Sequence, residues 1–369
     1  MKRIMYISFT TLFFLSLVSY VVLGRTSFGK LPKGEKLERI KQSPNYKNDE
    51  FQNQSATPTF TGQDSQLTAI YKFLFGKKER VTPIDSISVI KTDLTNLNPQ
   101  KDVLVWLGHS SYFIQIDGKR ILVDPVLDDH ASPFSWMIKA FKGSDAYKAE
   151  NIPDIDYLFI THDHWDHLDY ETVMKIKPRV KKVICGLGVG AYFEYWGFNP
   201  ASITELDWYE HTDLDKSWIA TATPARHFSG RGLKRNKTLW ASFVLQTPSM
   251  KIFIGGDGGY DKHFKEIGNK FGPIDLAILE QGQYDQRWKY IHLLPEQVFQ
   301  AALDLKAKNL LPVHNSKFAL AAHHWDEPLN KLAENSEHYN IRALTPMIGE
   351  TVNLKDTTQQ FSQWWKKLK

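Results

Sequence analysis

The sequence predicts a mixed α/β (α+β) fold, an αββα sandwich in which helices cover the outer faces of two packed β-sheets. Three observations predict it. Apolar runs of strand length recur from residue 103 onward, interspersed with segments that have helical spacing of apolar residues. The 369 residues are 42% hydrophobic and 13% aromatic, which suits an ordered core rather than a disordered chain. Side chains that can bind metals stand immediately after several of the apolar runs.

Short apolar runs, many rich in β-branched or aromatic residues, predict the strands. Asp117-Gly118 lies between two such runs and is a strong hairpin signal. The segments expected as strands are 103–107, 112–116, 120–124, 157–161, 182–185, 219–223, 242–246, 251–254, 276–279 and 310–313. The segments expected as helices are 66–74, 170–176 and 295–305.

The chain divides into four regions. Their boundaries are an N-terminal membrane anchor or signal peptide (1–24), a polar linker and N-terminal extension (25–99), the domain that carries the chemistry (100–355) and a C-terminal tail (356–369). The linker is rich in Lys, Asn, Gln, Ser and Pro, which is typical of an extended arm. Aromatic residues of the tail, Trp364 and Trp365, are expected to pack on the domain.

The N-terminal segment predicts a membrane location. Lys2 and Arg3 precede an uncharged, largely apolar stretch, residues 4–24, which is long enough to span a bilayer. Because this stretch exceeds the usual apolar region of a signal peptide, we favour an uncleaved anchor, with the catalytic domain outside the cytoplasm. Cleavage after Gly24 is the alternative, and it would give a secreted or periplasmic protein.

Charge and cysteine content exclude some classes of protein. The net charge of +5 comes from basic residues spread along the chain, so the sequence predicts no nucleic-acid partner. Cys185 is the one cysteine, which excludes an intramolecular disulfide, and its apolar neighbours predict a buried structural thiol. The oligomeric state stays open, with a homodimer among the options.

The motif that carries the chemistry is His162-x-His164-x-Asp166-His167, directly after the strand expected at 157–161. Imidazole nitrogen and carboxylate oxygen are both zinc ligands. Side chains two apart in an extended segment point to the same side, so His162 and His164 can converge on one ion. A tighter turn would direct Asp166 and His167 to a second ion.

Three further candidate ligands follow other expected strands. His227 comes after strand 219–223, Asp257 after strand 251–254, and His314 after strand 310–313. A lone histidine would favour a structural role, but the shared placement at strand ends indicates one site. Asp257 is flanked by glycines on both sides, which let the backbone approach a metal closely, and it is well placed to bridge two ions.

With these residues in place, the chain resembles the metallo-β-lactamase superfamily. The resemblance implies two Zn²⁺ ions, with Asp257 bridging them. It implies one ion on His162, His164 and His227, and the other on Asp166, His167 and His314. It favours zinc over iron, because diiron oxygen-reducing members carry Glu where His164 stands and also carry a flavin domain.

Longer blocks over roughly residues 100–350 resemble the branch of N-acylphosphatidylethanolamine-hydrolysing phospholipases D. The blocks include 106–111, 204–208, 224–231, 236–240 and 292–296. This resemblance implies that His292 meets a substrate phosphate. We expect Trp288, Tyr284 and Tyr290 to line an apolar substrate groove, and ordinary core packing is the equal alternative. The sequence departs from the branch pattern at His130 and at Ile291.

Gly186-x-Gly188-x-Gly190 follows a strand and is similar to a phosphate-binding loop. It lacks the full dinucleotide pattern, and the resemblance implies a structural turn, which we favour.

The sequence thus predicts a binuclear zinc-dependent hydrolase, most concretely a phospholipase D-type phosphodiesterase acting on N-acylphosphatidylethanolamine or a related phospholipid. Asp166 and Asp257 are the expected catalytic residues, holding and orienting the attacking water. The alternative within the fold is a lactonase or a phosphodiesterase that acts on a soluble small molecule. A non-catalytic, membrane-bound metal-binding protein is the rival from another class.

Overall fold

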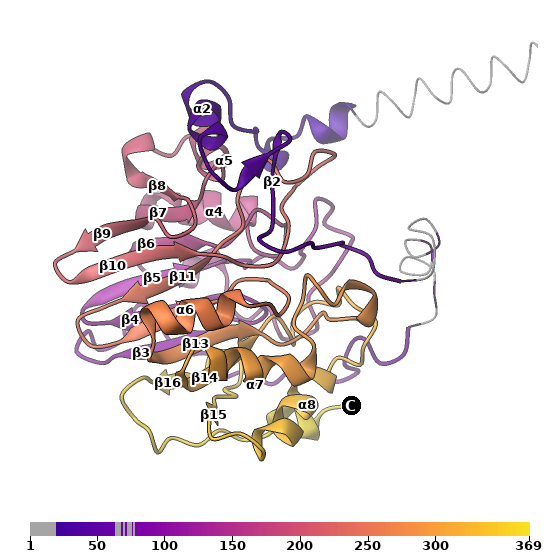
Figure 1. Ribbon diagram of the computed structural model, residues 1–369. Coiled ribbons are helices and arrows are strands. Elements are labelled where there is room, and N and C mark those ends of the chain that lie inside the picture. The colour runs from indigo at the N-terminus through magenta and orange to yellow at the C-terminus, as the bar shows by residue number, and fades with distance from the viewer. Residues whose placement is uncertain (1–19, 63–67, 69–70, 72–75, 77) are drawn as a thin grey trace, which may run out of the picture.

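A computed structural model describes residues 20–62, 68, 71, 76 and 78–369. Two seven-stranded sheets pack face to face, and helices lie on the outer face of each (Figure 1). The first sheet has the order β16-β3-β4-β5-β6-β7-β8, with bounds β3 (Val103–Trp106), β4 (Tyr112–Ile116), β5 (Lys119–Val123), β6 (Ile155–Ile160), β7 (Val180–Gly186), β8 (Ile203–Leu206) and β16 (Thr351–Asn353). The second has the order β15-β14-β13-β12-β11-β10-β9, with bounds β9 (His211–Asp215), β10 (Trp218–Thr223), β11 (Ser242–Gln246), β12 (Lys251–Ile254), β13 (Ile274–Glu280), β14 (Ala307–Val313) and β15 (Arg342–Ala343).

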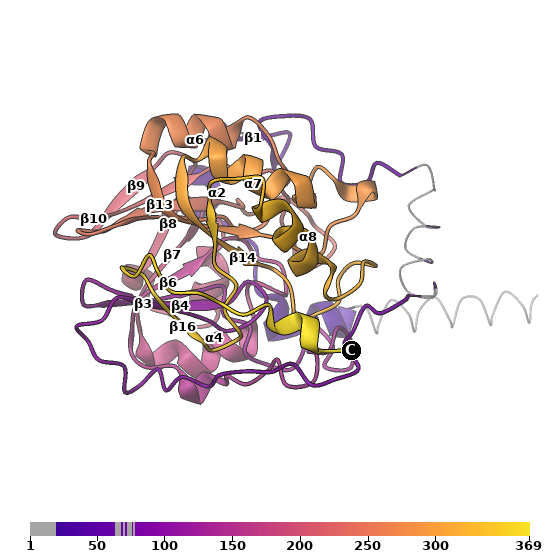
Figure 2. The same ribbon diagram turned by 90° about the horizontal axis from the view of Figure 1, so that it is seen from below.

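Helices complete the outer layers of the sandwich (Figures 1 and 2). The α-helices are α2 (Glu35–Lys41), α4 (Tyr170–Ile176), α5 (Gly190–Tyr195), α6 (His263–Phe271), α7 (Pro295–Asp304) and α8 (Glu327–Ser336). The 3-10 helices are η1 (Thr26–Phe28), η2 (Ala149–Asn151), η3 (Lys177–Arg179), η4 (Pro200–Ser202), η5 (Gln286–Trp288) and η6 (Trp364–Lys367).

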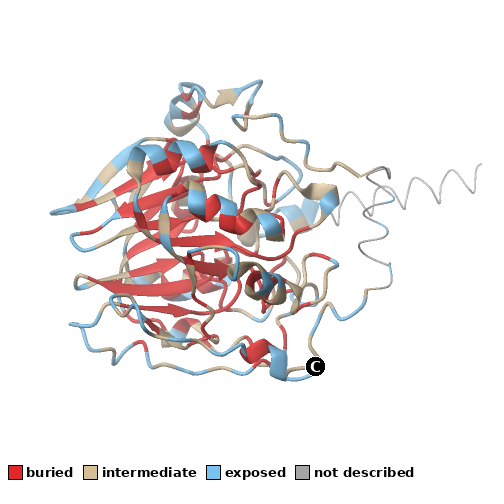
Figure 3. Ribbon diagram, turned by 60° about the horizontal axis from the view of Figure 1, so that its bottom comes forward, coloured by how far each residue is buried: buried red, intermediate tan, exposed pale blue. Residues whose placement is uncertain are grey.

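The core lies between the sheets, with a second apolar layer under the helices. Phe159 of β6 packs edge-on against Phe243 of β11, with ring centroids 5.3 Å apart, so side chains of the two sheets interdigitate. On the other face of the second sheet, Phe253 of β12 packs with Phe264 of α6 and Phe299 of α7 in a separate buried cluster. Figure 3 shows the strands buried and the helices exposed on their outward sides.

Most expected elements are confirmed. Each strand expected between residues 103 and 313 is present, as are the helices over 170–176 and near 295–305. The helix expected over 66–74 falls largely outside the described residues. The elements that were not predicted are strands β1, β2, β8, β9, β15 and β16 and helices α2, α5, α6 and α8. The edge strand β9, for example, alternates between exposed and half-buried residues and carries no apolar run.

The glycine-rich segment after β7 forms a structural turn, as expected. The backbone N–H groups of Gly188 and Gly190 both donate to one carboxylate oxygen of Glu205, at 2.7 and 3.0 Å. Gly188 has a φ of +88°, which favours glycine. Since the protein's own carboxylate takes the position that a phosphate would need, the turn serves the fold.

The N-terminal arm and the C-terminal residues both pack on the domain. Residues 25–62 run along it as an extended arm with α2 and a two-stranded hairpin, β1 (Tyr46–Lys47) and β2 (Glu50–Phe51). Lys36 of α2 pairs with Glu205, and Phe51 is fully buried. Trp364 and Trp365 are buried as expected, and the indole N–H of Trp365 donates to Asn330 at 2.8 Å.

The predicted anchor or signal segment lies mainly in residues 1–19, outside the described residues. Among the helices that the structure describes, none has both the length and the apolar character needed to cross a membrane.

Candidate metal centre

The expected metal ligands lie at one edge of the sandwich, where strands of both sheets end. Strands β12, β13 and β14 are parallel, and β10 runs in the direction of β12 because both pair antiparallel with β11. In the other sheet β6 is parallel to both of its neighbours. The loop after β6 carries His162, His164, Asp166 and His167, while His227, Asp257 and His314 follow β10, β12 and β14.

Three histidines form a first group of ligand atoms. The Nδ1 atom of His164 lies 2.9 Å from Nε2 of His162 and 3.2 Å from Nε2 of His227. Three nitrogens on one tetrahedral zinc would be about 3.3 Å apart, given Zn–N distances near 2.0–2.1 Å. The spacing of these three rings therefore suits a single shared ion.

A second group gathers around His167. Its Nε2 atom lies 3.5 Å from a carboxylate oxygen of Asp166 and 3.2 Å from Oδ1 of Asp257. Nδ1 of His314 approaches the same Asp257 oxygen at 3.3 Å. The other oxygen of Asp257, Oδ2, lies 3.9 Å from Nε2 of His162 and 3.8 Å from Nε2 of His227. Asp257 thus presents one oxygen to each group, the arrangement that a bridging carboxylate requires.

Buried polar atoms without hydrogen-bond partners test whether these residues fit metal ions. Among the described residues, Nε2 of His167, Nε2 of His314 and Oδ1 of Asp257 are buried and make no hydrogen bond. Leaving several such atoms unsatisfied at one point would cost about 1–3 kcal/mol each, unless a cation binds there. The donor set of five histidines and two carboxylates fits a binuclear metal centre.

The protonation states of most candidate ligands also suit metal binding. Burial lowers the pKa of His162, His227 and His314 well below the ordinary histidine range, so their rings are neutral at pH 7. Burial opposes ionisation of Asp257, but His167 holds its pKa well below the usual range. Burial also lowers the pKa of His167, but Asp257 and Asp166 outweigh this and raise that pKa well above the usual range, so a bound metal ion would displace a proton from this ring. Neutral imidazole and ionised carboxylate are the forms that bind metals.

Partners on neighbouring loops fix the orientation of the ligand rings. Asp124 accepts a hydrogen bond from Nδ1 of His167 at 2.8 Å, which leaves Nε2 for a metal. The carbonyl oxygen of Ile291 accepts from Nδ1 of His227 at 2.8 Å, and the hydroxyl of Ser110 lies 2.9 Å from Nδ1 of His314. Nε2 of His109 lies 3.0 Å from Asp166, so His109 contacts a ligand directly.

The N-terminal arm contributes to the centre through Asn53. The side-chain amide of Asn53 donates to the carbonyl of His227 at 2.7 Å, and its oxygen accepts from the His227 N–H at 3.1 Å. The indole N–H of Trp240 donates to that oxygen at 3.1 Å. A residue 174 positions earlier in the chain therefore clamps the backbone of a candidate ligand.

Arg231 connects the loop after β6 to the arm. Its buried guanidinium stacks on Trp165 at 3.8 Å and donates to the carbonyls of Asp163 and Leu168, at 2.9 and 2.5 Å. It also donates to the carbonyl of Ser27 at 2.9 Å. The metal-ligand loop is thereby held against the beginning of the arm.

A cleft of about 420 Å³ opens onto the ligands. Its lining comprises the candidate ligands His164, Asp166, His227, Asp257 and His314, the apolar Phe228, Trp288, Ile291 and Leu320, and the polar Thr59, Arg235, Gln283 and His292.

Of the two residues expected to bind substrate, His292 lies in this cleft, 4.0 Å from Oδ2 of Asp257. Tyr290 is not among the described residues that line it, and its ring instead lies under the guanidinium of Arg226 at 4.3 Å.

Sequence reasoning missed Asp124, Glu280 and Asn53, which lie around the ligands. Asp124 and Glu280 each stand at the end of a strand at this edge, so strand-end placement was a signal that could have found them. Asn53 lies in a polar arm, and no pattern in the sequence connects it to His227.

Comparison with known proteins identifies the fold family. The sequence model described as "Beta-lactamase superfamily domain" matches residues 119–315, more than half of the chain. The chain belongs to the metallo-β-lactamase superfamily. An uncharacterized superfamily relative from Mycobacterium tuberculosis is 34% identical over 88% of each chain.

The chain is also similar to a phospholipase and to a solved hydrolase structure. The N-acyl-phosphatidylethanolamine-hydrolyzing phospholipase D 1 of Caenorhabditis elegans is 31% identical, over 62% of this chain and 68% of its own. A solved structure described as a possible metal-dependent hydrolase from Veillonella parvula matches with a TM-score of 0.54. It covers 69% of this chain and 99% of its own at 12% identity, which supports the fold alone.

Proposed function

We propose that the protein is a binuclear zinc-dependent hydrolase that cleaves a phosphodiester bond of a membrane phospholipid, in the manner of a phospholipase D. The substrate would be N-acylphosphatidylethanolamine or a related lipid, and the products phosphatidic acid and the released alcohol or amide. The main support for the proposal is that an apolar wall and His292 lie beside the candidate metal ligands in one cleft. The Caenorhabditis elegans relative, named for this activity, supports it.

Zinc ions at this centre would supply Lewis-acid chemistry, lowering the pKa of water and neutralising charge on phosphoryl oxygens. His162, His164 and His227 would hold one ion and Asp166, His167 and His314 the other, with Asp257 between them. Asp257 can hold and orient a water between the ions, because its two oxygens face both groups. Asp166 is held in place for the same task by the ring of His109.

His292 is placed to bind a phosphoryl oxygen. Its Nδ1 atom bonds to Glu280 at 2.6 Å, which leaves Nε2 as the nitrogen available to a substrate in the cleft. Burial lowers the pKa of His292, but the carboxylate of Glu280 outweighs this and raises the pKa to about 9. The raised pKa favours the cationic ring, whose Nε2 can donate a hydrogen bond to a phosphoryl oxygen.

The apolar wall suits the hydrophobic part of a lipid. Phe228 packs on the rings of His164 and His227, with centroids 4.5 and 4.8 Å away, and so shields that side of the centre from water. Trp288, Ile291 and Leu320 complete the wall. Such a surface would bury glycerol or acyl carbons close to the scissile bond, whereas a small soluble diester would leave it exposed.

We further propose that residues 1–24 hold the protein at a membrane, with the catalytic domain outside the cytoplasm. The uncharged stretch over residues 4–24 supports an anchor.

Lipid mass spectrometry tests the proposed function. Purified full-length protein loaded with Zn²⁺ is incubated with mixed phospholipids, with an acyl lactone and with an aryl phosphodiester in parallel reactions. Formation of phosphatidic acid in the wild type, and its loss in Asp257→Asn, is the expected result. Turnover of the lactone or the aryl diester without attack on any phospholipid would replace the lipid assignment with one of those activities.

A further inference from the structure

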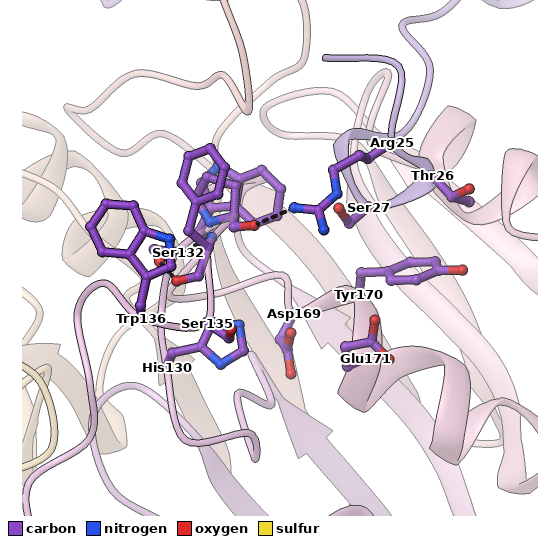
Figure 4. Close-up of a pocket in the computed structure, with 13 residues that line it drawn as sticks. Arg25, Thr26, Ser27, His130, Ser132, Ser135, Trp136, Asp169, Tyr170 and Glu171 are labelled. Atoms are coloured by element: carbon purple, nitrogen blue, oxygen red, sulfur yellow. Dashed lines mark hydrogen bonds between the residues drawn. The ribbon is translucent and has the colours of Figure 1, made fainter. Parts of the chain in front are cut away.

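Three surface segments meet beside the metal cleft. The first is the turn over residues 20–28, the second the loop 132–136, and the third the loop 230–235. Arg25 donates to the carbonyl of Pro133 at 3.4 Å, which joins the first two (Figure 4). A side chain at Gly232 would lie 3.7 Å from Leu23 and from Phe28, so the third segment adjoins the first.

These segments present large apolar side chains to solvent. Tyr20 is 78% exposed, Trp136 72% and Leu233 85%. The fold does not require such large apolar side chains to be this exposed to solvent. The ring of Trp136 stacks on that of Phe134 with centroids 5.7 Å apart, so the loop presents a pair of aromatic rings. We name Tyr20, Trp136, Leu233 and their neighbours Leu23 and Phe134 the apolar rim.

Basic residues accompany the apolar rim. Arg25 is exposed on the first segment, and Lys234 and Arg235 are exposed on the third. A cavity of about 620 Å³ adjoins the rim, and its lining includes Arg25, Trp136, Asp169 and Glu171 (Figure 4). Exposed tryptophan and leucine beside arginine and lysine suit the interface between phospholipid head groups and acyl chains.

The apolar rim is continuous with the metal cleft. Arg235, two residues beyond Leu233, lines the cleft, and its guanidinium lies over the ring of Phe228 at 5.1 Å. Phe228 in turn contacts the candidate ligand His164. One loop thus reaches from the exposed Leu233 to the wall of the cleft.

The sequence that precedes the apolar rim indicates what the rim binds. Tyr20 is the first described residue, and residues 4–19 before it contain no charged side chain. The apolar N-terminal sequence therefore joins the domain at the rim. A second copy of the chain is less suited as an occupant, because pairing this face with itself would bring Arg25, Lys234 and Arg235 of both copies together.

We infer that the apolar rim docks on a phospholipid bilayer and sets the mouth of the metal cleft against the lipid surface. The inference rests on the proposed function and deepens it, because it states how a phospholipid would reach the site. Trp136 and Leu233 enter the head-group region, and the basic residues contact lipid phosphates. A phospholipid then needs to rise only partly from the bilayer to enter the cleft.

A site-specific fluorescent probe tests the docking independently of catalysis. Cys185 is fully buried, and burial raises the pKa of its thiol well above the usual range, so a thiol-reactive probe will not label it. Trp136→Cys and Leu233→Cys each supply an exposed attachment point on the full-length chain. Lys216→Cys is the matched control, because Lys216 is exposed in the turn that precedes β10, at the edge opposite the centre.

Each labelled protein is floated with vesicles of phosphatidylethanolamine and phosphatidylglycerol. We expect the emission of probes at positions 136 and 233 to shift to shorter wavelength on the vesicles, and the probe at 216 to remain in water. Vesicle-bound protein with no shift at 136 and 233 would overturn the docking and leave the N-terminal segment as the whole attachment. Two other results would also overturn the docking. One is that the protein does not bind the vesicles, and the other is an emission shift that depends on protein concentration in the absence of vesicles.

A paired rate measurement separates this inference from the proposed function. The double variant Trp136→Asp with Leu233→Asp should hydrolyse phospholipid in vesicles roughly tenfold or more slowly than wild type, because two apolar contacts with the bilayer are lost. Its rate on a short-chain phospholipid below the micellar concentration should be unchanged. Equal rates on vesicles would overturn the docking. Absence of activity in wild type on both substrates would overturn the proposed function.

Discussion

The structure predicts that Asp124 controls metal affinity without touching a metal. Asp124 is buried and accepts three hydrogen bonds, from Nδ1 of His167 at 2.8 Å and from the N–H and hydroxyl of Thr161 at 2.9 and 2.5 Å. In Asp124→Asn the shape is kept, but the negative charge that holds the proton on Nδ1 is lost. His167 can then place its proton on Nε2, the atom that a metal needs.

The expected loss is roughly 10–100-fold in affinity for the ion at His167, which corresponds to about 1.4–2.8 kcal/mol. Competition with a chromophoric chelator measures both zinc affinities, and thermal unfolding of metal-free protein measures the fold itself. Asp129→Asn is the matched control, because Asp129 is exposed and pairs with Lys139 at the surface. If the affinities of both zinc sites in Asp124→Asn equal those of wild type, the role given to Asp124 is refuted.

Three further perturbations test other parts of the structure. Asp166→Asn should abolish most turnover while zinc stays bound, and wild-type turnover in that variant would contradict the role given to Asp166. Asn53→Ala should weaken zinc binding and leave the unfolding temperature of the metal-free protein within a few degrees of wild type. The arm variant Asn45→Ala is its control. Equal zinc affinities in the two variants would show that Asn53 does not contribute to the centre. Burial lowers the pKa of Lys317 from 10.5 to about 8, so the charged form is disfavoured in the fold. Stability should therefore rise by up to about 3 kcal/mol as the pH increases from 8 to 10.5. Denaturant unfolding should show this rise in wild type but not in Lys317→Met, and a parallel pH dependence of the two proteins would show that Lys317 does not cause it.

The candidate ligands were predictable because their positions follow from local patterns. Buried strands appear as apolar runs, and in an α/β sandwich strands that run in one direction end at one edge, so His227, Asp257 and His314 were expected near the loop after β6. The spacing of His162 and His164 needed only the geometry of an extended segment. Asp124 and Glu280 also stand at strand ends, but a single carboxylate after a strand is common and does not by itself indicate a site.

Other contacts could not be predicted, because they join segments that are far apart in the sequence. Asn53 reaches His227 through the path of a polar arm, and nothing in the arm's composition determines where it docks. Tyr290 was expected in the groove, but its ring lies under the guanidinium of Arg226 instead.

The sequence by itself determined the αββα sandwich, the set of metal-binding side chains and the membership of the metallo-β-lactamase superfamily. It could do so because strand periodicity and ligand chemistry are properties of short segments. Only the tertiary structure decided that Asp257 turns one oxygen to each group of ligands and that the arm clamps His227. It also decided that Trp136 and Leu233 share one surface with the basic residues. These features depend on loop paths, which the packing of the whole chain sets.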